Sequence, residues 1–141
     1  MGYKLINPKA DIGIEVWGKD EKELIEESIR ALLDLIEIDR SQIGEKDSMT
    51  VEIESIDSED LLISTLNTVI YLLDAKKFAI KDFQIENLDL KNYRVKIKFI
   101  GEKWKENKDY GITREIKAAT YHNISIKREK GVLKTEIIFD V

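Results

Sequence analysis

Three short segments, far apart in the sequence, carry the side chains best suited to chemistry. They are Ala10-Asp11-Ile12-Gly13-Ile14, Ile116-Lys117-Ala118-Ala119-Thr120-Tyr121-His122 and Phe139-Asp140-Val141. Carboxylates bind cations, a lysine neutralises negative charge, and a histidine donates hydrogen bonds or changes charge near neutral pH. Each residue taken alone also fits a structural role. Asp11 suits a solvated strand end or a turn, Lys117 an exposed strand position, and His122 a hydrogen-bonded histidine.

Together the three segments resemble the archease family, a group of small accessory proteins for the RtcB-type tRNA-splicing ligase. That ligase joins RNA ends using a guanylylated histidine and divalent metal. Trp17-Gly18 before a first helix and Glu59-Asp60-Leu61-Leu62 at the start of a second extend the resemblance along the chain. It implies a non-catalytic activator that binds the ligase and promotes its guanylylation and turnover. The alternative role that the resemblance implies is a chaperone-like adaptor for tRNA-modifying enzymes.

The resemblance also implies a metal site. Asp11 and Asp140 match the metal-binding aspartates of the family, and the terminal carboxylate of Val141 would be a third ligand. Carboxylates about 4 Å apart repel by about 4 kcal/mol at an effective dielectric near 20, so such a cluster takes up protons or holds a cation. Hard oxygen ligands favour Ca²⁺, with Mg²⁺ or Mn²⁺ as alternatives, over zinc or copper. So few protein ligands leave places for water or a partner group.

The resemblance makes Lys117, Thr120 and His122 candidate residues for partner contact and activation. On a regular strand Lys117, Ala119 and Tyr121 would share one face, and Thr120 and His122 the other, unless a bulge intervenes. Lys117 would then neutralise charge at the metal site or meet an acidic partner. The sequence does not choose between these roles.

The chain departs from the family pattern before Asp11. The family usually has His-Thr immediately before its Ala-Asp, whereas this chain has Pro8-Lys9. Pro8 fixes its own φ and restricts Asn7, so the approach to Asp11 is stiffened. Any metal or ligase contact made by the usual histidine is missing here.

Composition excludes several classes of protein. With no cysteine and one histidine, the chain has no disulfide framework, thiolate nucleophile or multi-histidine zinc site. A Ser-His-Asp order and a phosphate-binding glycine loop are also missing, so we expect no catalytic residues; a metal-dependent hydrolase is the weakest alternative.

The net charge of -5 disfavours direct attraction to nucleic acid, so tRNA would be met only indirectly, through the ligase. Without a signal core or membrane-spanning run, we expect a cytoplasmic protein that contacts no membrane. Its oligomeric state stays open.

Periodicity predicts two amphipathic helices. Asp20, with Glu23 three residues on, starts the first, and either Asp57 or Ser58 caps the second. Each helix carries an apolar stripe at helical spacing: Leu24, Ile25, Ile29, Leu32, Leu33 and Ile36 in the first, and Leu62, Leu66, Val69, Ile70 and Leu73 in the second.

The rest of the chain predicts strands. Alternating apolar residues mark strands over 11–17, 49–53 and 93–99, and 78–85 forms either one strand or two. Strand signals return over 116–127 and 132–139, with a hairpin turn at 129–131. The charged stretch 102–111 is expected to be a mobile loop. Trp17 and Trp104 favour packing over base stacking, because no RNA-binding motif surrounds them. The fold class is therefore α+β, with two helices packed on mixed, mostly antiparallel sheets in a single domain covering 1–141.

Overall fold

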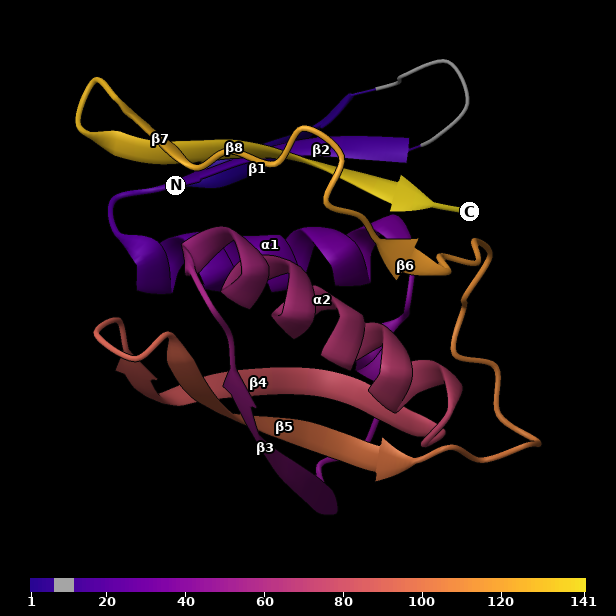
Figure 1. Cartoon of the computed structure of the whole chain (residues 1–141). Coiled ribbons are helices and arrows are strands. Elements are labelled where there is room, and N and C mark those ends of the chain that lie inside the picture. Colours follow the sequence, from indigo (N-terminus) through magenta and orange to yellow (C-terminus); the bar gives the residue numbers. More distant parts are fainter. Residues whose placement is uncertain (7–11) are drawn as a thin grey trace.

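The computed structural model describes residues 1–6 and 12–141, and these form three layers: two helices lie between two β-sheets (Figure 1). The helices are α1 (Glu21–Leu35) and α2 (Ser58–Asp74), with a short 3-10 helix, η1 (Arg40–Gln42). One sheet contains β1 (Gly2–Ile6), β2 (Ile12–Gly18), β6 (Ala118–Ala119), β7 (Lys127–Glu129) and β8 (Val132–Asp140). The other contains β3 (Asp47–Glu54), β4 (Phe78–Asp89) and β5 (Arg94–Lys103). The predicted α+β class is confirmed, and every described strand pairing is antiparallel.

Both helices start where the sequence predicts. The Asp20 carboxylate accepts the Glu23 N–H at 2.9 Å, and the Asp57 carboxylate accepts the Asp60 N–H at 2.7 Å, so each aspartate satisfies a free donor of the first turn. The Glu23 side chain accepts from the N–H of Lys19, one residue before the expected partner. Neither described helix is long and apolar enough to cross a membrane.

The central position of the helices explains why they are buried on more than one side. The predicted stripe of α1 is buried, and so are Glu27 and Ser28. Glu27 pairs with Arg30 at 2.7 Å, and the Ser28 hydroxyl donates to the Leu24 carbonyl at 2.7 Å. A helix covered by a sheet on each side must satisfy its buried polar groups in this local way.

The five-stranded sheet joins the two ends of the chain. Its order is β1-β2-β8-β6, with β7 also paired to β8, so β8 lies in the middle. Strand β1 was not expected from the sequence. It is tied to α1 because the Tyr3 hydroxyl donates to Asp34. Burial and this hydrogen bond raise the pKa of Tyr3 to about 12.

The three-stranded sheet has the order β3-β5-β4. Strand β4 is continuous over the predicted segment and carries two bulges, between Ile80 and Asp82 and between Ile85 and Asn87. Strand β5 begins at Arg94 and not at Tyr93, because Tyr93 has a φ of 53° and belongs to the preceding turn.

The predicted strand over 116–127 is largely wrong. Only Ala118–Ala119 and Lys127–Glu129 are strands, and a turn at His122 and Asn123 separates them. Asn123 has a φ of 56°, and the N–H of Ile124 donates back to the Tyr121 carbonyl at 3.3 Å. A left-handed residue breaks the strand, so the expected alternation of faces ends at Ala119.

The charged stretch 102–111 is irregular after Lys103, yet hydrogen bonds to the buried Glu102 at its start hold it in place. Glu102 is 3% exposed and accepts hydrogen bonds from the Gly44 N–H, the Tyr110 hydroxyl (2.9 Å) and the Lys108 ammonium (3.2 Å). These donors, the Gly44 N–H first, lower the pKa of Glu102 to about 2. Trp104 packs on Tyr110 with ring centroids 4.3 Å apart, so this tryptophan has a packing role.

Candidate metal and partner site

The candidate metal site lies where β2 and β8 meet. Ile12 pairs with Phe139, so the start of β2 lies beside the end of β8. Asp140 is exposed, and Val141, the next residue, is 48% exposed. Asp11 lies outside the described residues, but the juxtaposition of the two strands that a shared site requires is present.

Lys117 lies next to Asp140. Its N–H donates to the Asp140 carbonyl at 2.9 Å, and Ala118 pairs with Asp140 in the β6–β8 ladder. The side chain of Lys117 is exposed. The structure therefore brings together a predicted partner residue and a predicted metal ligand from two separate segments.

Thr120 has a structural position, whereas His122 is exposed. The hydroxyl and the N–H of Thr120 both donate to the Ile138 carbonyl at 2.9 Å, and the side chain is 9% exposed. The His122 N–H donates to the Thr120 hydroxyl at 3.3 Å, which starts the turn away from β8. Thr120 thus fixes the point at which the chain leaves the sheet, and His122 follows at the surface.

Helix α2 holds this segment through side chains that the sequence analysis did not single out for this role. Asn67 makes two hydrogen bonds to the backbone of Ala119: its amide nitrogen donates to the carbonyl at 3.1 Å, and its amide oxygen accepts the N–H at 2.8 Å. The Tyr121 hydroxyl donates to Asp60 at 2.6 Å, and Glu59 accepts the Ile126 N–H at 3.1 Å.

The Tyr121–Asp60 hydrogen bond shifts the pKa of both groups. The bond from Tyr121 lowers the pKa of Asp60, because it stabilises the carboxylate. The same bond, with burial, raises the pKa of Tyr121. The acidic start of α2 therefore does more than cap the helix: Asp60 and Glu59 position the chain on both sides of His122.

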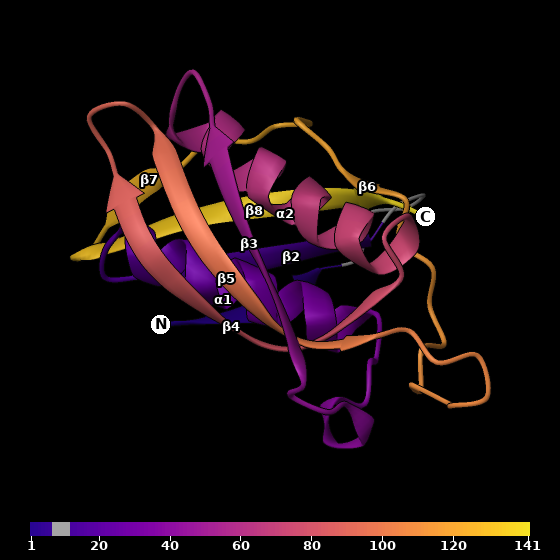
Figure 2. The same cartoon turned by 90° about the horizontal axis from the view of Figure 1, so that it is seen from below.

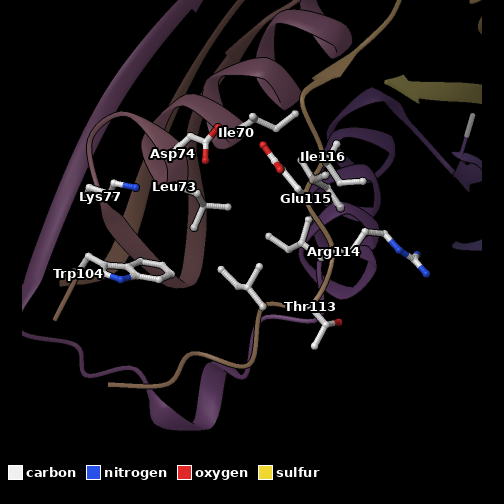
Figure 3. A pocket seen from close by; sticks show the side chains of 12 residues that line it. Ile70, Leu73, Asp74, Lys77, Trp104, Thr113, Arg114, Glu115 and Ile116 are labelled. Carbon is white, nitrogen blue, oxygen red and sulfur yellow. The ribbon is translucent and has the colours of Figure 1, made fainter. Parts of the chain in front are cut away.

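A cavity of about 450 Å³ lies beside Ile116, directly before the partner segment, which is residues 117–122 with the predicted partner residues (Figure 3). Side chains of α2 face residues 113–116 across it, and Trp104 and Lys77 lie at one side. The lining is mainly apolar, with charged side chains on both sides of the cavity. The lining residues are Leu32, Ile36, Ile70, Leu73, Asp74, Lys77, Trp104, Ile112, Thr113, Arg114, Glu115 and Ile116. Because Ile116 leads directly into Lys117, the cavity and the candidate site share one segment.

The donor set at the end of β8 fits a hard divalent cation. Asp140 and the carboxylate of Val141 are neighbours in sequence at an exposed strand end and would offer hard oxygen donors. Within residues 1–6 and 12–141, no three His, Cys, Asp or Glu side chains are grouped so that they could hold a metal ion. A complete site would therefore depend on Asp11 and the terminal carboxylate, and it stays a prediction.

Solved structures share this arrangement of layers. The solution structure of Methanobacterium thermoautotrophicum protein 1598 matches with a TM-score of 0.77 and 28% identity, covering 99% of each chain. The crystal structure of an archease, a possible chaperone, from Thermotoga maritima matches with a TM-score of 0.66 and 31% identity, covering 98% of this chain and 96% of the other. The fold and the paired strand ends define an α+β protein of the archease type.

The sequence comparisons agree with the structures. The model of the Archease protein family (MTH1598/TM1083) matches residues 3–141. Protein archease of Archaeoglobus fulgidus is 32% identical over 139 residues, covering 98% of both chains, and that of Pyrococcus furiosus is 37% identical over 121 residues, covering 84% of this chain and 83% of the other. The chain belongs to the archease family.

Proposed function

We propose that the chain is a non-catalytic activator of an RtcB-type tRNA-splicing RNA ligase in the cytoplasm. It would bind the ligase, promote guanylylation and turnover, and meet tRNA only through the ligase. Family membership supports this role. The single structural observation that carries the proposal is the pairing of Ile12 with Phe139, which holds the ends of two distant segments together.

The proposed site consists of Asp11, Asp140 and the Val141 carboxylate, with Ca²⁺ as the preferred ion and Mg²⁺ or Mn²⁺ as alternatives. Ile12 and Phe139 are the sequence neighbours of Asp11 and Asp140, and their pairing supports a shared site. When bound, the ion would supply positive charge of the kind that stabilises a transferring phosphate.

The chain's own residues would prepare this site for a partner. Lys117 lies beside Asp140 and would offset part of the negative charge, while His122 would present a hydrogen-bond donor at the exposed turn. Thr120 would act by fixing the direction of the chain between these two contacts. The absence of the family's usual His-Thr before Ala10 leaves binding to the three carboxylates.

Ligase turnover, measured with and without the chain, tests the proposal. We expect Asp140→Asn and Asp11→Ala to lose stimulation, because each removes a charged ligand. Asp47→Asn is the matched control, since it makes the same chemical change at an exposed residue of the other sheet. Equal stimulation by wild type and Asp11→Ala would remove the acidic site from the proposed mechanism.

Calcium titration calorimetry tests the metal site without the ligase. We expect heat of binding from wild type, and about tenfold or greater loss of affinity in Asp140→Asn. Extending the chain by one residue beyond Val141 converts its carboxylate into an amide and should weaken binding similarly. Unchanged affinity in both variants would contradict the proposed ligand set.

The second candidate function is a chaperone-like adaptor for tRNA-modifying enzymes. The similarity to the Thermotoga maritima archease, a possible chaperone, favours it. This function predicts suppression of aggregation for several client enzymes with equal strength in wild type and Asp140→Asn. An effect confined to the ligase would favour activation instead.

A further inference from the structure

Strand β3 has an open edge. It pairs with β5 on one side, and among the described residues no strand pairs with its other side (Figure 2). Its eight residues keep one regular register without a bulge. Such an edge presents backbone donors and acceptors to which another strand can bind.

The other outer strand of this sheet is protected, in contrast to β3. Two bulges interrupt β4, and the Lys81 ammonium donates to the carbonyls of Ile43 (2.9 Å) and Arg40 (3.4 Å), which holds the η1 segment beside it. Bulges and covering segments are the usual protection of sheet edges. The difference makes β3 the edge suited to pairing.

The hydrogen bond after β3 shows which backbone groups face outward. Ser55 donates its N–H to the Tyr93 carbonyl at 2.9 Å, one position beyond the pair Glu54 and Arg94. Inward and outward groups alternate along an antiparallel strand, so the odd-numbered residues of β3 bond to β5. The even-numbered residues direct their N–H and C=O groups to the open edge: Ser48, Thr50, Glu52 and Glu54.

We infer that a second copy of this chain adds to this edge, antiparallel, about a two-fold axis at Thr50. Directly opposite residues lie on the same face, and the outward-facing even-numbered residues pair with one another for an axis at any residue of β3. An axis at Met49 would set Asp47 opposite Val51, and an axis at Val51 would leave Lys46 and Glu54 without opposite charges. An axis at Glu52 would place two glutamates directly opposite each other. An axis at Ser48 would leave much of the strand unpaired.

The axis at Thr50 makes the charges complementary. It sets Lys46 of each copy opposite Glu54 of the other, Ser48 opposite Glu52, and Thr50 opposite itself. On the face toward the helices it sets Met49 opposite Val51, both half-buried within one copy. Opposite charges and apolar pairs across strands are stabilising, so the edge is complementary to itself. The product is a six-stranded sheet across the two copies.

Thr50→Pro tests the inference most directly. Its N–H points away from β5, so the substitution removes an outward donor and blocks the incoming strand without breaking the β3–β5 ladder. Sedimentation of the whole chain from about 1 µM to about 1 mM should show a concentration-dependent dimer for wild type and a monomer for Thr50→Pro. Thr50→Val keeps the N–H and should still dimerise. A monomeric wild type, or a dimer unaffected by Thr50→Pro, overturns the inference.

A charge exchange tests the register and does not depend on proline. Lys46→Glu and Glu54→Lys should each weaken the dimer by about tenfold or less, and the double variant should restore it, because the opposite charges meet again. No restoration in the double variant overturns the Thr50 axis. Hydrogen exchange gives a second readout: protection of the Thr50 amide should rise with protein concentration, and an amide that exchanges equally fast at all concentrations contradicts the pairing.

Discussion

Asn67 is predicted to hold the partner segment on the fold. Its amide makes both hydrogen bonds to Ala119, whose N–H and C=O point away from β8 because the neighbouring Thr120 N–H bonds to Ile138. Ala119 is 4% exposed, so it cannot replace these bonds fully with water. Asn67 therefore takes the place of a further strand at this edge of the sheet.

The expected cost follows from the two groups left without partners. A buried backbone group that loses its hydrogen bond costs about 1–3 kcal/mol. For Asn67→Leu, which fills the space but cannot bond, we expect the free energy of unfolding to fall by about 2–6 kcal/mol. For a domain of this size that corresponds to a Tm lower by about 6–18 °C. Asn67→Ala leaves room for water to bond to Ala119, so its loss of unfolding free energy should lie at the low end of this range.

Urea unfolding, followed by circular dichroism, measures the change. Asn107→Ala is the control, because it alters the same residue type at an exposed loop position and should change stability by less than about 0.5 kcal/mol. Hydrogen exchange should also become faster at the Ala119 amide in both Asn67 variants. A destabilisation by Asn67→Leu below about 0.5 kcal/mol, with unchanged exchange at Ala119, would refute the reasoning.

Three further predictions concern titrating groups. The pKa of Glu102, about 2 against an ordinary 4.5, means that its stabilisation is present above pH 4.5 and is lost as the pH falls toward 2; Glu102→Gln should flatten this acid limb of urea midpoints, and an unchanged limb would contradict the assignment. The pKa of Tyr3 is raised to about 12 from 10.0, so the neutral hydroxyl stabilises the fold below pH 10, and this stabilisation is lost between pH 10 and 12. Tyr3→Phe should remove that loss of stability at alkaline pH, measured by the same urea midpoints. Tyr121→Phe should raise the pKa of Asp60 toward its ordinary value in an NMR carboxyl titration, since the hydroxyl is the largest cause of its lowering; a static Asp60 curve would show that the bond does not form in solution.

Local signals in the sequence predicted most of the secondary structure. Asp20 and Asp57 cap helices through bonds to residues three positions away, so each cap is contained in one short stretch of sequence. The apolar stripes of the helices and the alternation in β3 and β5 are likewise local. The metal site that the family resemblance implies requires the first predicted strand to lie beside the last, and the register of Ile12 with Phe139 shows that the two lie together.

What the sequence did not predict depends on contacts between distant residues. The Asn67–Ala119 bonds join positions 52 residues apart, and no local pattern marks an asparagine in a helix as a strand partner. The segment 116–127 has strand composition, but Asn123 and the Thr120 hydroxyl turn it away from the sheet. The sequence assigned the buried Glu102 to a charged loop because its hydrogen-bond partner Gly44 lies in another part of the chain.

The central position of β8 has a consequence for synthesis on the ribosome. The β1–β2 hairpin emerges first, whereas the strand that must cover the inner edge of β2 is made after every other described element. Strands β3, β4 and β5 are closer in sequence and can pair earlier (Figure 2). A nascent chain therefore carries an uncovered apolar β2 for most of its translation, and pairing across so long a separation is slow. Truncated or stalled products of this chain should be the species most prone to aggregate.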